Sequence, residues 1–162
     1  MANMGITLAR FCLAAWIGAA SLFVVTGVRE VTTTNPILNN SPVKDALVAV
    51  RFPAYYAFGF TLTILAGIGI AISATRLQLS RKRFVASFSL VLISLALMTC
   101  DYVWIYSPLL EMVTPAGNPK PAEFVQYHEA SKHINMTQLS LLFVASMVIC
   151  WPTASSKNSH SS

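Results

Sequence analysis

Charged residues are scarce in this chain. Only 10% of its 162 residues are Asp, Glu, Lys or Arg, whereas ordinary soluble domains contain about 25%. Apolar residues make up 55% of the sequence, which leaves little of the chain for a separate soluble domain. The net charge of +5 does not indicate a nucleic-acid-binding protein, because the basic residues are dispersed along the chain and form no stripe.

Cysteine and histidine are also few, and their positions do not fit a metal or cofactor site. Cys12, Cys100 and Cys150 lie in apolar stretches without a Cys-x-x-Cys pair, which argues against a disulfide framework or a zinc site. The first histidine is His128, so the earlier segments offer no facing histidines for a haem.

Catalytic motifs are equally hard to find. His128-Glu129 begins like a zinc-protease motif, but His133 follows His128 by five residues instead of the four that place two ligands on one helix face. The chain has no glycine-rich phosphate loop and no Ser-His-Asp order. We therefore predict no cofactor, no bound metal and no enzymatic activity.

The sequence instead contains four long apolar runs. They are Ile6–Val28, Phe52–Ala74, Phe84–Tyr106 and Ile134–Trp151. A helix needs about 20 apolar residues to cross about 30 Å of hydrocarbon. We predict an all-α fold: a four-helix transmembrane bundle, forming a single membrane domain over residues 1–152. The Ser-rich residues 153–162 are expected to be a disordered cytoplasmic tail.

The first run has a second interpretation, as a cleavable signal peptide. Its small residues Gly18-Ala19-Ala20 could mark a cleavage point. The apolar pattern continues past them, however, through Leu22–Val25. We therefore expect this run to remain a membrane helix.

The distribution of basic residues predicts the orientation. The short link 75–83 carries Arg76, Arg81, Lys82 and Arg83 and no acid, and short basic links stay in the cytoplasm. Both termini are then cytoplasmic, and all six acidic residues lie on or near the outer side. We expect a multi-pass protein of the plasma membrane or the bacterial inner membrane.

The two longer links face outward in this orientation and are partly helical. Ser41-Pro42 is typical of a helix start, so the second helix is expected to begin outside the bilayer. Pro121 indicates the same for the fourth helix. Pro108 is expected to end the third helix soon after Tyr106.

Small residues and aromatic residues mark two further surfaces. Gly59, Thr63, Gly67 and Ala71 are four residues apart and allow close helix contact, either within the bundle, which we favour, or in a homo-oligomer. An aromatic belt at the outer membrane surface is predicted from Tyr55, Tyr56, Tyr102, Trp104 and Tyr106.

A polar stripe on the fourth helix is the candidate site. At about 100° per residue, His128, Ser131, Asn135 and Gln138 share one face. The third helix offers Ser87, Ser94 and Asp101, seven residues apart. Polar groups in hydrocarbon face the bundle interior, so we expect the two stripes to face each other.

Asp101 is the most informative residue of these stripes. We expect it to pair with Arg51, Arg29 or Lys132, either as part of an ion, proton or substrate site or as an ion pair near the headgroups. We favour an ion pair or a carboxylate that simply extends toward the headgroups, because Asp101 lies near the outer end of its helix, close to water.

Some of these residues also resemble the sequence motifs of a known family. His128-x-x-Ser131-x-x-x-Asn135, followed by an apolar helix, is similar to the closing signature of the transmembrane protein 205-like family, and Trp16-Ile17-Gly18 with Phe23-Val24-Val25 resembles that family's first helix. Where the family has a proline and an aromatic residue after that helix, this chain has Gly27–Glu30. The resemblance implies a four-helix membrane protein without an assigned reaction.

Three functions follow from the pattern. The first is handling of a small solute or ion through an outer vestibule formed by Asp101, Arg51, His128 and Asn135 and narrowing to Gln138. The second is a structural or accessory subunit whose stripe only fixes helix packing. The third is a pH sensor in which His128 changes its contact with Asp101. The lipid bilayer is the one partner that the sequence predicts directly.

Overall fold

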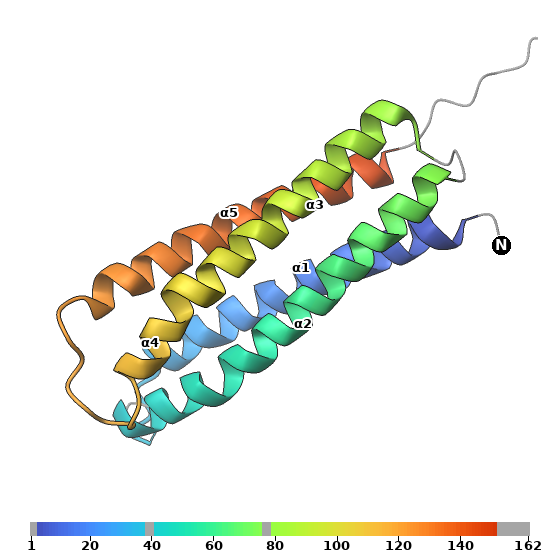
Figure 1. Cartoon of the computed structure of the whole chain (residues 1–162). Coiled ribbons are helices and arrows are strands. Elements are labelled where there is room, and N and C mark those ends of the chain that lie inside the picture. Colours follow the sequence, from blue (N-terminus) through green and yellow to red (C-terminus); the bar gives the residue numbers. More distant parts are fainter. Residues whose placement is uncertain (1–2, 38–40, 76–78, 152–162) are drawn as a thin grey trace, which may run out of the picture.

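The chain folds into a bundle of long helices (Figure 1). The computed structural model describes residues 3–37, 41–75 and 79–151, so the predicted tail 153–162 and Arg76 lie outside the described residues. The helices are α1 (Met4–Thr32), α2 (Ser41–Thr75), α3 (Arg81–Asp101), a π-helical segment η1 (Tyr102–Tyr106), α4 (Ser107–Met112) and α5 (Phe124–Cys150).

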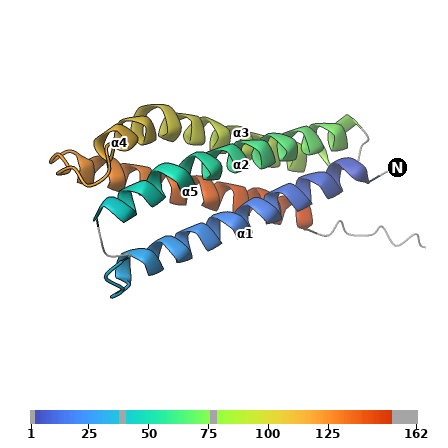
Figure 2. The same ribbon diagram turned by 90° about the horizontal axis from the view of Figure 1, so that it is seen from below.

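The predicted all-α four-helix bundle is confirmed. Within the described residues, four helical stretches are long and apolar enough to cross a membrane: Met4–Glu30, Pro42–Thr75, Arg81–Met112 and Phe124–Cys150. Each span runs antiparallel to the span before it in the chain (Figures 1 and 2). α1 packs on α2, α2 on α3, α3 on α5 and α5 on α1. These four stretches are compatible with an integral membrane protein.

The third span is longer than predicted, and Pro108 does not end it. The backbone N–H of Ser107 donates to the carbonyl of Tyr102, five residues earlier, in a π-type turn. Pro108 follows directly in the first turn of α4, where a missing N–H is tolerated. The change of hydrogen-bond register before the proline thus lets the helix continue to Met112.

Glycines bring α1 and α2 into close contact. A Cβ atom at Gly69 would lie 2.6 Å from the carbonyl oxygen of Gly5 and 3.2 Å from the Cβ of Ala9. A Cβ atom at Gly59 would lie 2.6 Å from the Trp16 ring.

Gly69 was not part of the predicted small face. Of that face, Gly59 packs on α1, Thr63 is buried and Gly67 lies beside Val91 of α3. The predicted face is therefore used inside the bundle, which is the use that we favoured from the sequence.

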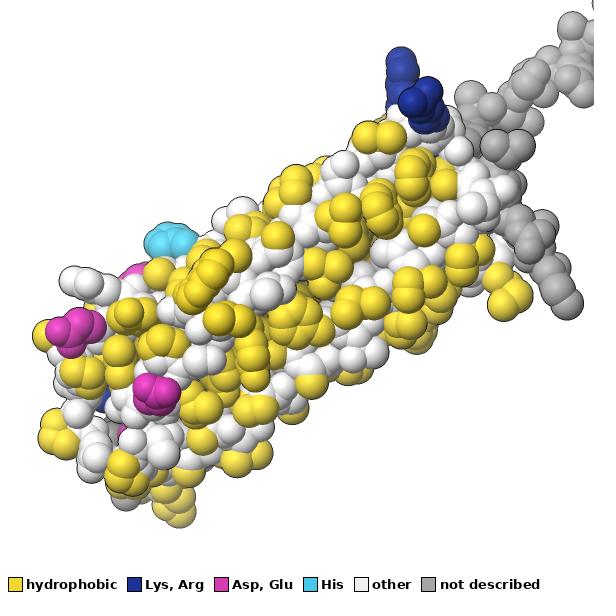
Figure 3. All heavy atoms as spheres, viewed as in Figure 1, with side chains coloured by type: hydrophobic (Ala, Val, Ile, Leu, Met, Phe, Trp, Pro, Cys, Tyr) yellow, Lys and Arg dark blue, Asp and Glu magenta, His cyan; other side chains and the backbone are white. Residues whose placement is uncertain are grey.

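The two ends of the bundle differ in charge. All six acidic residues lie toward the end that holds the link between α4 and α5, and Figure 3 shows acidic side chains there on the face in view, with basic side chains protruding at the opposite end. We call these the acidic end and the basic end. At the acidic end, Asp45 accepts a hydrogen bond from the N–H of Gly117 (3.0 Å) and pairs with Lys120 (2.9 Å), which joins α2 to the loop before α5.

The packing predicts opposite effects for two glycine substitutions. Gly59→Ala should lower the free energy of unfolding by about 1 to 3 kcal/mol, because the added methyl group overlaps the Trp16 ring in a filled core. Gly18→Ala, at an exposed helical position with no atom within 4 Å of the new Cβ, should leave stability equal or higher. Unfolding of the detergent-solubilised variants measures both. Equal stability of the two variants would contradict this account of the α1–α2 contact.

The predicted orientation is tested by labelling cysteines in intact cells. With Cys12, Cys100 and Cys150 replaced by alanine, Glu123→Cys reports on the acidic end and Ser80→Cys on the basic end. Since basic ends stay in the cytoplasm, a membrane-impermeant maleimide should label Glu123→Cys in intact cells and Ser80→Cys only after permeabilisation. The reverse pattern would overturn the cytoplasmic placement of both termini.

Candidate functional site

Polar side chains of α3 and α5 meet inside the bundle, as the two stripes predicted. Ser87, Ser94 and Asp101 on α3 are all buried. The Ser94 hydroxyl donates to the backbone carbonyl of Gln138 on α5 (3.4 Å), and Asn135 of α5 binds Asp101 directly. The seven-residue spacing on α3 therefore indicated the face that packs on α5.

Asp101 is the centre of this cluster and is only 1% exposed. Its Oδ2 accepts hydrogen bonds from the Tyr56 hydroxyl of α2 and from Asn135 Nδ2 of α5, each 2.6 Å long. Both distances lie at the short end of the range for hydrogen bonds. One carboxyl oxygen thus joins three helices.

Asn135 connects the carboxyl group to the rest of the cluster. Its Oδ1 accepts from the Tyr55 hydroxyl (3.1 Å) and from Gln138 Nε2 (3.0 Å). Its Nδ2, besides binding Asp101, lies 2.9 Å from the carbonyl oxygen of Ser131, one turn earlier in α5. With all its amide atoms engaged, Asn135 is held in one orientation.

Two buried acceptor oxygens of the cluster have no partner among the described residues. They are Asp101 Oδ1 and Gln138 Oε1. The Ser131 hydroxyl lies beside the carboxyl group, yet it makes no hydrogen bond of ordinary geometry to Oδ1. Buried polar atoms in native proteins nearly always have partners, so these oxygens indicate a place where a proton or a cation could bind.

The predicted site residue Arg51 lies elsewhere, and the predicted ion pair of Asp101 with Arg51 or Lys132 was wrong. Arg51 pairs with Glu30 and lies over the ring of Phe23, with 4.8 Å between Cζ and the ring centroid. Lys132 pairs with Glu129 (2.9 Å). In the described part of the chain Asp101 contacts only neutral donors, because it lies inside the bundle and not at the headgroups where the charged side chains are.

His128 is also separate from the cluster. Its side chain is exposed, and its ring stacks on Phe124 with 6.0 Å between centroids. The predicted contact between His128 and Asp101, on which the pH-sensor hypothesis depended, is not formed. The first turns of α5 carry His128 beyond the part of the helix that packs on α3.

The sequence interpretation missed the tyrosines of α2. Tyr55 and Tyr56 were assigned to a lipid-facing belt, but they are 8% and 1% exposed and bind the cluster. The spacing of these residues could have indicated their burial, because Tyr55 lies four residues before Gly59 and thus on the same inward face of α2. Tyr106 is buried as well, whereas Tyr102 and Trp104 remain exposed, as a belt requires.

Comparisons with known proteins add no further assignment. The chain matches no family model, no curated protein and no solved structure. Among the described residues, no group of three or more His, Cys, Asp or Glu side chains could hold a metal ion.

Replacing the central amide should loosen the bundle. Asn135→Leu removes two interhelical hydrogen bonds, to Asp101 and to Tyr55, and at about 0.6 kcal/mol per interhelical bond we expect a loss of about 1 kcal/mol in the free energy of unfolding. Met136→Leu, at the exposed neighbouring position, is the matched control and should not change stability. Thermal unfolding in detergent measures both, and equal midpoints would show that the cluster does not hold the helices together.

Proposed function

We propose that this integral membrane protein transports a small monovalent cation, a proton in the simplest case, by binding it at the carboxyl group of Asp101. The observation that carries the proposal is a buried carboxyl group that contacts no basic side chain in the described part of the chain and has one oxygen without a partner. The sequence led us to expect a small solute or an ion, and a cation is the species that we now propose.

The energy of an isolated charge supports a cation at this position. Removing an ion from water costs several kcal/mol even after the protein relaxes, and neutral hydrogen bonds offset only part of that cost. A proton on Oδ1 would remove the charge, and a monovalent metal ion would balance it. Charged groups inside membrane helices are for this reason usually functional.

The surroundings of Asp101 favour a cation over other small solutes. The acceptor atoms of the cluster without a partner among the described residues, Asp101 Oδ1 and Gln138 Oε1, are both oxygens, and hard cations prefer oxygen ligands. No arginine or lysine that could hold an anion is bound to the cluster in the described residues. Toward the acidic end the cluster is covered by Tyr106, whose ring lies 4.9 Å from that of Tyr56 and whose buried hydroxyl has no described partner.

A second candidate function, a structural or accessory subunit, is favoured by a different observation. The chain of hydrogen bonds from Tyr56 through Asp101 and Asn135 to Tyr55 and Gln138 joins α2, α3 and α5. Such a chain fixes the rotation of each helix about its axis without any bound ion. The two functions differ in what Asp101→Asn should change.

Replacing Asp101 by asparagine removes the titratable group and leaves the shape of the side chain unchanged. Asp101→Asn keeps the size and an acceptor oxygen but cannot take up a proton or balance a cation. In vesicles containing the purified full chain, decay of an imposed pH gradient or uptake of radioactive sodium should be faster with the wild type than with empty vesicles. The Asp101→Asn variant should fall to the level of empty vesicles.

The control is Glu111→Gln, which removes an exposed carboxylate from α4 at the same end of the bundle and should behave as wild type. If the wild type transports neither ion faster than empty vesicles, or if Asp101→Asn equals the wild type, cation handling at Asp101 is excluded. Loss of thermal stability without a change in flux would then support the structural function.

A further inference from the structure

The basic end carries positive charge that no acidic side chain balances. Arg10, Arg81, Lys82 and Arg83 lie at this end, and all six acidic residues of the chain lie toward the other. By contrast, Arg51, Lys120 and Lys132 at the acidic end each pair with a carboxylate. The basic end therefore attracts anions more strongly than the rest of the surface.

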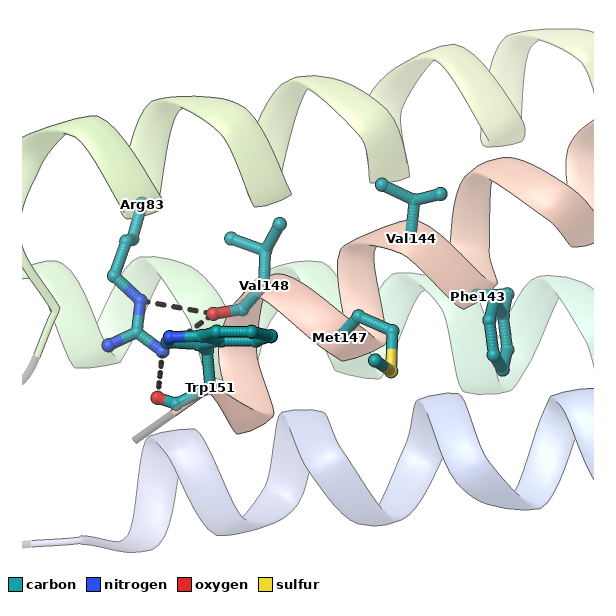
Figure 4. Close-up of a pocket in the computed structure, with 6 residues that line it drawn as sticks. All are labelled: Arg83, Phe143, Val144, Met147, Val148 and Trp151. Carbon is teal, nitrogen blue, oxygen red and sulfur yellow. Dashed lines mark hydrogen bonds between the residues drawn. The ribbon is translucent and has the colours of Figure 1, made fainter. Parts of the chain in front are cut away.

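Arg83 is held in place by the end of α5. Its Nε and Nη2 donate to the carbonyl of Val148 (3.0 and 2.6 Å), and Nη2 also donates to the carbonyl of Trp151. The C-terminal carbonyls of a helix carry partial negative charge, and Arg10 binds another of them, that of Ile149 (2.9 Å). Figure 4 shows that the remaining terminal nitrogen of Arg83 points away from these contacts.

An apolar groove begins at this arginine. It has a volume of about 340 Å³ and is lined along α5 by Phe143, Val144, Met147, Val148 and Trp151, with Arg83 as its one charged residue (Figure 4). From Phe143 to Trp151 the helix rises about 12 Å, at about 1.5 Å per residue. This length approaches half of a hydrocarbon core of about 30 Å, which is the depth of one leaflet.

We propose that this groove and the basic residues Arg81, Lys82 and Arg83 form a binding site for one anionic phospholipid. The phosphate binds the exposed side chains of Arg81 and Lys82 and the free edge of the Arg83 guanidinium. An acyl chain lies along α5 from Trp151 toward Phe143. A phospholipid fits because its anionic headgroup is joined to an apolar acyl chain, just as the basic residues of the site adjoin the apolar groove. Basic clusters at helix ends bind such headgroups.

Native mass spectrometry of the detergent-solubilised full chain tests the site by titration with phosphatidylglycerol, phosphatidylcholine or glycerol phosphate. We expect the wild type to retain phosphatidylglycerol in preference to phosphatidylcholine and to bind glycerol phosphate weakly. The double variant Arg81→Gln/Lys82→Gln, which leaves the Arg83 contacts intact, should bind phosphatidylglycerol roughly thirtyfold more weakly, the scale that two basic side chains supply at a membrane surface.

A second pair of variants tests the groove. Met147→Trp fills it and should also weaken phosphatidylglycerol binding, whereas Ile68→Trp, at an exposed apolar position on α2, should not. Equal binding of the two phospholipids by the wild type, or wild-type binding by both the charge and the groove variants, would overturn the proposal. Binding of glycerol phosphate as tight as that of phosphatidylglycerol would also overturn it, because the site would then bind free phosphate groups and not a lipid.

Discussion

A buried carboxyl group determines how the helices of this bundle are arranged. Hydrocarbon offers polar groups no hydrogen bonds, so each of them must find its partner in the protein. Oδ2 of Asp101 takes one partner from α2 and one from α5, and the Tyr55 hydroxyl reaches Asn135 from the same face of α2. Rotating any of the three helices about its axis would break at least one of these contacts. α1 joins the arrangement through Trp16, whose ring lies 4.8 Å from that of Tyr55.

The polar cluster depends in turn on the small residues of α2. Tyr55 and Tyr56 lie one turn before Gly59, where α2 is close to both Trp16 and Met98. A larger side chain at this position would push α2 away from α1 and α3, and it would carry the tyrosine hydroxyls away from their acceptors. Hydrogen bonds weaken steeply with distance and angle, so packing and polar contacts are coupled here. The glycine, which binds nothing itself, is in this sense a positioning residue for the carboxyl group.

Much of this architecture could be predicted from the sequence, because the thickness of a bilayer sets the length of each apolar run. Helical periodicity also placed the polar residues of α3 and α5 on facing sides, and the structure confirms contacts of Ser94 with Gln138 and of Asp101 with Asn135. The partners of Asp101 could not be predicted in the same way. A carboxylate in a sequence suggests a basic partner, but Arg51 is taken by Glu30, and the actual donors, Tyr56 and Asn135, are neutral. Tyrosine suits both a membrane interface and a buried hydrogen bond, so composition alone does not decide between them. The π-helical turn before Pro108 has no comparable sequence signal.

The two ends of the bundle differ in charge, so the molecule is electrically asymmetric along the helix axes. At the acidic end Arg51, Lys120 and Lys132 each form an ion pair with a carboxylate. Asp101 lies deeper in the bundle, where its partners among the described residues are neutral. At the basic end Arg10 and Arg83 bind helix carbonyls, which carry only partial charge, so that the full positive charge of these guanidinium groups remains to be balanced from outside the protein. Electrostatics therefore attracts anions to the basic end, whereas at the acidic end the basic residues nearly balance the acidic ones and Asp101 is left without a basic partner among the described residues. The two sites that we propose lie in opposite halves of the same four helices, and each would take up the counter-charge that its own end of the chain does not supply.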